Sequence, residues 1–150
     1  MAAQKYNARD VVFEIESLTT PATWIEIGGI NTFSKSHEEE TADTTTFASQ
    51  GQAESQKMQI GKQLELEGMR LRDSVTGAID PGQAMVETLA ERLGEESLGR
   101  IRFAHKDDPE WEVWTAHANL GDQGGGNNDK TSWSATFTRS GADTTEVKAA

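Results

Sequence analysis

The chain has 150 residues, which is typical of one domain and enough to bury roughly 70% of the unfolded surface. It contains no cysteine, which excludes a disulfide framework, a thiolate metal site and a cysteine nucleophile. Fourteen basic and 25 acidic side chains give a net charge of −11, the wrong sign for binding nucleic-acid phosphates. High net charge also keeps proteins soluble, so it fits both plain solubility and a surface that repels a polyanion.

No apolar run approaches the ~20 residues of a membrane-spanning helix. The N-terminal sequence MAAQKYNARD is polar and lacks the pattern of a signal peptide. We therefore expect a soluble protein that is made in a cytoplasm and has no membrane partner.

Two strands are predicted before residue 34. Residues 11–18 alternate as in a half-buried strand, and residues 19–22 contain a proline and form a turn. Residues 24–33 form the second strand, which Gly28 and Gly29 interrupt. Glycine inside a strand pattern indicates a bulge or a close backbone approach.

Residues 34–59 are the most unusual stretch, because their only large apolar side chains are Phe47 and Met58. A structureless loop of this length is uncommon in a compact domain. The stretch has no proline, and its four threonines between residues 41 and 46 favour strand. We predict that residues 34–62, approximately, form an arm that this chain cannot bury by itself.

The strand after the arm changes its apolar parity at Gly68, as the strand before it does at Gly28. If the two strands form one hairpin, these glycines are equidistant from Ala48. This symmetry predicts a tip at residues 47–49 and places Ile30 beside Leu66.

One helix is predicted, at about residues 81–93. Asp80 is suited to the N-cap, Pro81 to the first helical position and Gly94 to the C-terminal stop. The predicted apolar face comprises Met85, Val86, Leu89 and Leu93, and the polar face comprises Gln83, Glu87, Glu91 and Arg92.

The remaining chain predicts further strands at residues 100–103, 110–113 and 131–139, with a glycine-rich connection at 121–129 and a loose tail from residue 140. The fold class is therefore mainly β: six or seven strands in two packed antiparallel sheets, as in a β-sandwich or barrel, with one flanking helix. Residues 1–150 form a single domain, with residues 1–9 and 140–150 as flexible or assembly segments.

No catalytic, cofactor or metal site is predicted, and we expect no enzyme. His37, His105 and His117 lack metal-site spacing and are expected to be exposed. The run from Gly124 to Gly126 does not lead into a helix, so it does not indicate phosphate binding. The loop around Asp122 also lacks EF-hand spacing.

The tryptophans offer an alternative function. Trp111 and Trp133 have inward parity, whereas Trp114 is out of phase with Val113 and is the candidate for an exposed ring. An exposed ring could stack on a sugar, as in a carbohydrate-binding β-sandwich module on a virion or cell surface.

The layout of the chain resembles the major tail tube proteins of long-tailed bacteriophages over nearly its whole length. The matching features are W-x-E-I-G-G-I-x-x-F at residues 24–33, the acidic, threonine-rich arm, the helix that opens with Asp-Pro, and the late W-x-A-x-F-T-R-S-G segment. The resemblance implies the fold shared with the inner tubes of contractile tails and type VI secretion systems.

The resemblance also implies a structural subunit of hexameric rings that stack around a tape measure protein into a hollow tube. Tail tip and terminator proteins are further partners, and DNA passes through without specific binding. The protein would be made and assembled in the host bacterial cytoplasm and reside in the virion tail.

In such a tube, the arm is expected to contact neighbouring subunits, and outward acids on the following strand are expected to face the lumen. The predicted lumen residues are Glu65 and Glu67. The predicted interface residues are Glu38, Glu39, Glu40, Thr44, Thr45, Thr46, Phe47, Gln50 and Met58.

Overall fold

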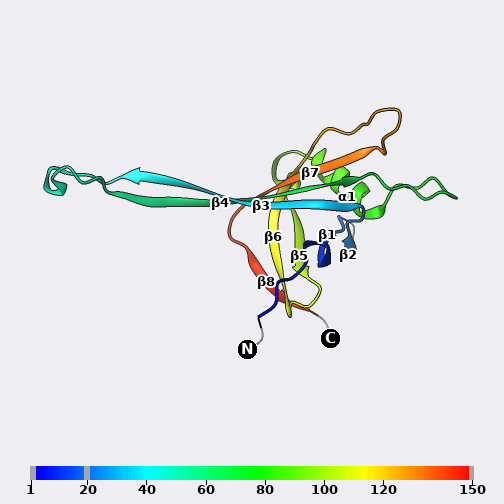
Figure 1. The fold of residues 1–150 in the computed structure, drawn as a ribbon, viewed down its shortest axis with the longest axis horizontal. Coiled ribbons are helices and arrows are strands. Elements are labelled where there is room, and N and C mark those ends of the chain that lie inside the picture. The colour runs from blue at the N-terminus through cyan, green and yellow to red at the C-terminus, as the bar shows by residue number, and fades with distance from the viewer. Residues whose placement is uncertain (1–2, 19–20, 149–150) are drawn as a thin grey trace.

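The computed structural model describes residues 3–18 and 21–148. Predictions for residues 1–2, 19–20 and 149–150 therefore lie outside the described residues; they concern the two chain ends and half of the first turn. Within the described ranges there are eight strands and one α-helix (Figure 1). These are β1 Val11–Glu16, β2 Trp24–Glu26, β3 Ile30–Asp43, β4 Ser55–Met69, α1 Pro81–Ala90, β5 Gly99–His105, β6 Glu110–Leu120, β7 Ser132–Arg139 and β8 Thr144–Val147.

The strands form a single antiparallel sheet in the order β2-β1-β5-β6-β7-β4-β3, with β8 against β6. The first half of β6 pairs with β5 and β8, and its second half pairs with β7. The sheet bends along β6, so its two halves face each other, and the ring of Phe33 on β3 lies 5.2 Å from that of Phe13 on β1. The mainly β class with one helix is confirmed; the two predicted layers are halves of one continuous sheet that does not close into a barrel.

The hydrophobic core lies between the two halves and is completed by α1. The predicted alternation holds where β4 and β7 pair: Leu64 and Leu66 of β4 and Trp133, Ala135 and Phe137 of β7 are all buried. The helix contributes Val86 and Leu89. The largest buried side chains of the core are Trp114, Trp133, Phe137, Ile15, Leu64, Leu66, Leu89 and Val86.

The helix begins as predicted and ends earlier. The Asp80 carboxylate accepts a hydrogen bond from the Gln83 backbone N–H at 3.2 Å, and Pro81 is the first helical residue. The helix stops at Ala90, and the chain becomes extended at Leu93, which is exposed. Placing Leu93 on the apolar face was therefore wrong, because Gly94 begins a separate 3₁₀ turn instead of ending the helix.

The backbones at the base of the arm are in close contact, as the glycines predicted. A Cβ on Gly68 would lie 2.0 Å from the carbonyl oxygen of Gly29, and that oxygen accepts a hydrogen bond from the Met69 N–H at 2.9 Å. Gly29 has a φ of 78°, which disfavours any other residue. No side chain fits at this crossing, so two glycines are required there.

The long hairpin and its tip at residues 47–49 are confirmed, but the predicted register is wrong. Ile30 pairs with Gly68, and Leu66 pairs with Phe33. The outermost pair, Asp43 with Ser55, centres the hairpin on residue 49. The pairing of β3 with β4 also shifts by one residue at two places, between residues 30 and 32 and between residues 40 and 41 of β3. Such irregularities move the pairing by one residue, so symmetry about one point cannot hold along the whole hairpin.

The C-terminal segment is more ordered than predicted. Residues 144–147 form β8 along the first half of β6, and the Lys148 ammonium donates to the carbonyl of His105 at 2.7 Å. On the outer side of this half, the Arg102 guanidinium lies between the rings of Trp24 and Trp111, at 4.3 and 4.5 Å. It also contacts the carboxylates of Glu14 and Glu146. The segment is therefore docked on the body up to Lys148.

Candidate assembly surfaces

The arm leaves the body where pairing with β7 ends, at Gln63. Beyond that point β3 and β4 continue as a two-stranded hairpin that projects far from the rest of the chain (Figure 1). No residue between 34 and 60 is buried. Two strands without a hydrophobic face to cover are marginally stable in water, and both edges offer unpaired backbone groups. The prediction of an arm that this chain does not bury is confirmed.

The tip of the arm is a defined turn. Phe47–Ser49 form a 3₁₀ helix closed by reciprocal bonds between Thr46 and Ser49. The hydroxyl of Thr45 accepts from the Glu54 N–H at 2.8 Å and donates to the Glu54 carbonyl at 3.1 Å. This turn holds the ring of Phe47 fully exposed to solvent.

One side of the arm continues the core-facing side of the sheet. Directly paired residues share a side of the hairpin. The pair of Phe33 and Leu66 lies on the core-facing side in the body, and the pair of Glu39 and Ile60 lies on the same side further out along the arm. Leu66 is fully buried in the body, whereas Ile60 is 52% exposed. The inner side of the hairpin is thus left uncovered once it passes the body.

The opposite side forms a continuous polar face across four strands. Both predicted lumen residues, Glu65 and Glu67, lie on it and are exposed. Their neighbours on adjacent strands are hydroxyl, amide and imidazole side chains, and none is Lys or Arg. This polar face comprises Thr32, Ser34 and Ser36 of β3, Gln63, Glu65 and Glu67 of β4, Ser134, Thr136 and Thr138 of β7, and His117 and Asn119 of β6.

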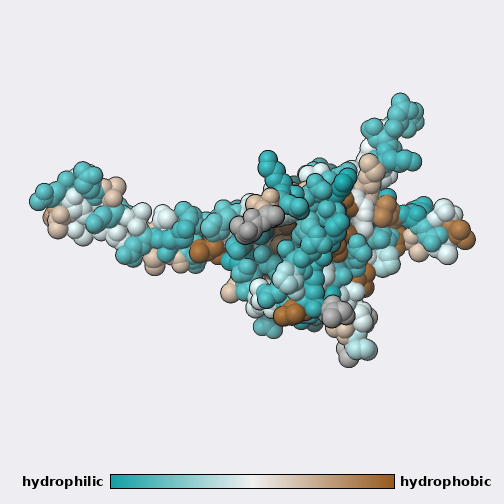
Figure 2. All heavy atoms as spheres, turned by 60° about the horizontal axis from the view of Figure 1, so that its bottom comes forward, coloured by the Kyte–Doolittle hydropathy of each residue, from teal (hydrophilic) through white to brown (hydrophobic). Residues whose placement is uncertain are grey.

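The structure brings all nine predicted interface residues together on the arm, outside the body. Near its middle, Glu39 and Lys57 form an ion pair at 2.7 Å, and the hydrogen bond from Lys57 lowers the pKa of Glu39. Ile60 was not among the predicted interface residues, although the alternation of β4 alone places it on the same side as Leu64 and Leu66. Figure 2 shows the arm as a largely hydrophilic projection with small apolar areas.

A buried glutamine fixes the base of the arm to the helix. Gln83 donates from Nε2 to the carbonyls of Gly28 and Met69, at 2.9 and 2.8 Å, and accepts from the Leu71 N–H at 3.1 Å. Placing Gln83 on the polar face was wrong, since it is fully buried. One side chain therefore satisfies backbone groups just before β3 and at the end of β4, the two strands that form the arm.

The tryptophan predicted to be exposed is buried. Trp114 has no exposed surface, and its Nε1 donates to Glu112 at 2.7 Å. The inward parity of β6 falls on even numbers, because Trp114 and Ala116 are fully buried. Glu112 is on the same side and lines a cleft, where its carboxylate lies 3.5 Å from the Lys35 ammonium. Trp111 is consequently on the outer side, half-buried against Arg102. The sugar-stacking ring proposed at Trp114 does not exist.

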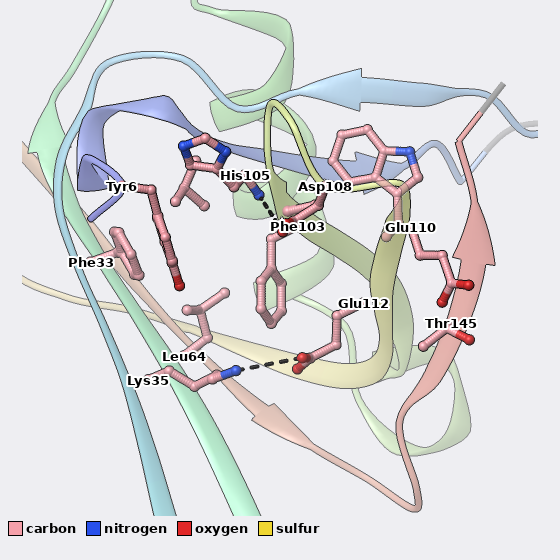
Figure 3. Close-up of a pocket in the computed structure, with 13 residues that line it drawn as sticks. Tyr6, Phe33, Lys35, Leu64, Phe103, His105, Asp108, Glu110, Glu112 and Thr145 are labelled. Atoms are coloured by element: carbon pink, nitrogen blue, oxygen red, sulfur yellow. Dashed lines mark hydrogen bonds and ion pairs between the residues drawn. The ribbon is translucent and has the colours of Figure 1, made fainter. Parts of the chain in front are cut away.

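A cleft of about 390 Å³ opens between the two halves of the sheet (Figure 3). His105 lines it and is buried, so the prediction that it is exposed was wrong, whereas His37 and His117 are exposed as predicted. The Nδ1 atom of His105 accepts from the Asp107 N–H at 3.1 Å, and Tyr6 packs edge-on against its ring at 4.9 Å. No hydroxyl nucleophile is hydrogen-bonded to His105 among the contacts of the described residues.

Residues 3–18 and 21–148 show neither a metal-binding cluster nor a membrane-spanning helix. No cluster of three or more His, Asp or Glu side chains suited to a metal ion occurs in these ranges. No helix there is both long and apolar enough to cross a bilayer.

No protein-family model matches the chain, and no curated protein matches it. The chain does match several solved structures. A chain in the tail of an empty gene transfer agent particle, determined with C6 symmetry, superposes with a TM-score of 0.70 at 17% identity. The match covers 97% of this chain and 100% of that one. The chain has the fold of a phage-like tail component.

Two further structures support the same fold. A chain from the virion of a native gene transfer agent particle matches with a TM-score of 0.63 and 17% identity, covering 95% of this chain and 100% of its own length. A chain from the six-fold symmetrised baseplate of the anti-feeding prophage matches with a TM-score of 0.60 and 13% identity, covering 98% of both chains. The resemblance to tail tube proteins is thereby confirmed at the level of fold.

Proposed function

We propose that the protein is a structural subunit of a phage or phage-derived tail tube, in which hexameric rings stack into a hollow channel for DNA. The observation that carries the proposal is the arm, a regular hairpin with a defined turn at its tip and no buried residue between positions 34 and 60. A neighbouring subunit would cover its inner side and pair its free edges. Contacts of this heterologous kind close into rings or continue as filaments.

The fold and the symmetry of its structural neighbours support the same conclusion. The gene transfer agent tail was determined with C6 symmetry, and the anti-feeding prophage baseplate was six-fold symmetrised. By analogy, six copies of this chain would form each ring. A tape measure protein inside the tube and tail tip and terminator proteins at its ends would be the further partners, and the tube would reside in the virion tail.

The polar face provides a wall suited to the lumen. It carries the carboxylates of Glu65 and Glu67 and neither Lys nor Arg. Charge effects are screened beyond about 8 Å at physiological salt, so these acids would act on DNA close to the wall. They would prevent adhesion of phosphates, and no catalytic step is needed.

The carbohydrate-binding alternative loses its support. It relied on an exposed ring at Trp114, which is buried. The two tryptophans on the outer side, Trp24 and Trp111, already stack against Arg102.

Electron microscopy of purified protein, alone and with a tail initiator, tests the proposal. The wild type is expected to form rings or tubes. In the matched variant, an Asn-Gly turn replaces residues 42–56, joining Thr41 to Lys57, which are paired in the hairpin. This variant is expected to remain a folded monomer, with unchanged circular dichroism, that does not assemble. A wild type that stays monomeric with every initiator would overturn the proposal, and a shortened variant that unfolds would show that the arm supports the body.

A further inference from the structure

The end of the molecule opposite the arm also projects. After β4 ends, residues 70–80, here called the distal loop, extend away from the body along the longest axis (Figure 1). Val75 near its tip is 91% exposed, and among the described residues only Phe47 is a more exposed large apolar side chain. The two most exposed apolar groups therefore occupy opposite ends of the chain.

The distal loop is a defined structure. The Asp73 carboxylate accepts from the N–H groups of Val75 and Thr76, at 2.7 and 3.0 Å, and the hydrogen bonds of these two amides, that of Thr76 first, lower its pKa. The backbone N–H of Asp73 donates to Ala78 at 2.8 Å, and Arg72 forms a β-bridge with Ile79. Such a loop holds Val75 in a fixed position, as the 3₁₀ turn holds Phe47.

A shallow depression lies at the base of the distal loop, with a volume of about 360 Å³. Its apolar lining comes from Leu71, Ala78, Ile79 and Pro81, with Arg72 and Asp73 also beside it. Leu71 is 39% exposed although it is a leucine next to the core. Apolar atoms are visible in this region at the end of the molecule away from the arm (Figure 2).

The tip of the arm is acidic, whereas the distal loop has two arginines and two aspartates and no net charge. Residues 41–56 of the arm contain two charged side chains, Asp43 and Glu54, and both are acidic. In the distal loop, Arg70 pairs with Glu87, and the carboxylates of Asp73 and Asp80 accept from backbone amides. Arg72 is exposed and forms no ion pair with any residue that the structure describes. It is the charge of the loop that remains available for an acidic partner.

We propose that the arm tip of one copy docks on the distal loop of the next copy, with Phe47 packed against Leu71, Val75 and Ile79. Arg72 then lies near the acids of the tip. Each copy carries one tip and one distal loop at opposite ends, so the contact repeats without limit along the axis. The inference rests on the proposed function, and it specifies which surface receives the arm when rings stack.

Cross-linking tests this contact directly because the chain has no cysteine of its own. The double variant Phe47→Cys/Val75→Cys is assembled and then mildly oxidised. A disulfide requires Cα atoms within about 7 Å, so docking predicts a ladder of covalent oligomers on a denaturing gel. The two single variants are expected to stop at dimers. A matched double variant, Phe47→Cys/Val147→Cys, uses another exposed valine, on β8, and is expected to give no ladder.

A mixing experiment separates this contact from the proposed function. Phe47→Asp keeps an intact distal loop, and Val75→Asp keeps an intact tip, so each alone is expected to need at least about tenfold more protein to assemble. Mixed together, they are expected to form heterodimers through the one intact contact. Tubes that form without a 47–75 ladder would overturn this docking and leave the proposed function standing. Failure of the wild type to form rings or tubes would overturn both.

Discussion

The same strand, β4, behaves in opposite ways in the body and in the arm. Leu64 in the body is 1% exposed, whereas Ile60, four residues away on the same side, is 52% exposed. Both residues sit in a regular antiparallel ladder with β3. The difference lies in what covers them: β5, β6 and α1 close over the body, and no residue that the structure describes closes over the arm.

This contrast separates folding from assembly within one hairpin. Burying a Leu or Ile side chain contributes about 1.5–3 kcal/mol, and the body obtains this from its own core. The arm can obtain it only from another molecule. We therefore expect substitutions in the body to lower stability and substitutions in the arm to affect assembly.

The largest expected effect comes from a core aromatic. Phe137 on β7 is fully buried opposite Leu64. Phe137→Ala is expected to reduce the free energy of unfolding by about 3–5 kcal/mol, because it leaves a cavity in packed surroundings. Urea denaturation of the unassembled protein measures this. A loss below about 1 kcal/mol would mean that the two halves of the sheet do not enclose a packed core.

The next effect tests the junction between the two regions. Gln83→Leu keeps the size of the side chain but leaves the carbonyls of Gly28 and Met69 and the N–H of Leu71 without their partner. We expect a loss of about 2–4 kcal/mol, because buried polar groups without hydrogen bonds are costly. Amides at the base of the arm should also exchange hydrogen faster. Thr88→Ala, on the exposed side of the same helix, is the control and should change stability by less than about 0.5 kcal/mol.

A smaller, pH-dependent effect is expected for Glu87. Burial opposes its ionisation, but hydrogen bonds from Arg70, Trp133 and Gln123, with the charge of Arg70, lower its pKa below the ordinary 4.5. A lowered pKa in the folded state stabilises the protein above pH 4.5, and this stabilisation is lost as the pH falls through the folded pKa. Glu87→Gln should therefore cost about 1–2 kcal/mol at pH 7 and progressively less in acid. An equal cost at pH 7 and pH 3 would contradict this role.

Several parts of the fold could be predicted because their cause is local. Asp80 and Pro81 begin the helix by capping chemistry, and the glycines at the base of the arm mark a crossing where no side chain fits. The arm itself was evident from a long polar stretch without proline. Each of these features depends on residues that are close in sequence or on the properties of a single residue type.

Other parts depend on contacts between distant segments. The inward parity of β6 is that of Trp114, which is fully buried and packs edge-on against Phe103 of β5. The strand at residues 144–147 has no apolar alternation and is held by Glu146 and Lys148 against the body. The hairpin register also depends on a second irregularity, between residues 40 and 41, that no local motif marks. In each case tertiary contacts decided the outcome against the local pattern.

The smallest expected effect on the isolated chain completes the comparison. Phe47→Ala is the same substitution as Phe137→Ala, but the ring of Phe47 contacts solvent instead of a core. We expect the free energy of unfolding of the monomer to change by less than about 0.5 kcal/mol, because no buried surface is lost. Assembly should nevertheless weaken, since the removed ring is the largest apolar group at the tip. A loss above about 1 kcal/mol in the monomer would show that the tip folds back onto its own body, and the division between folding in the body and assembly through the arm would then fail.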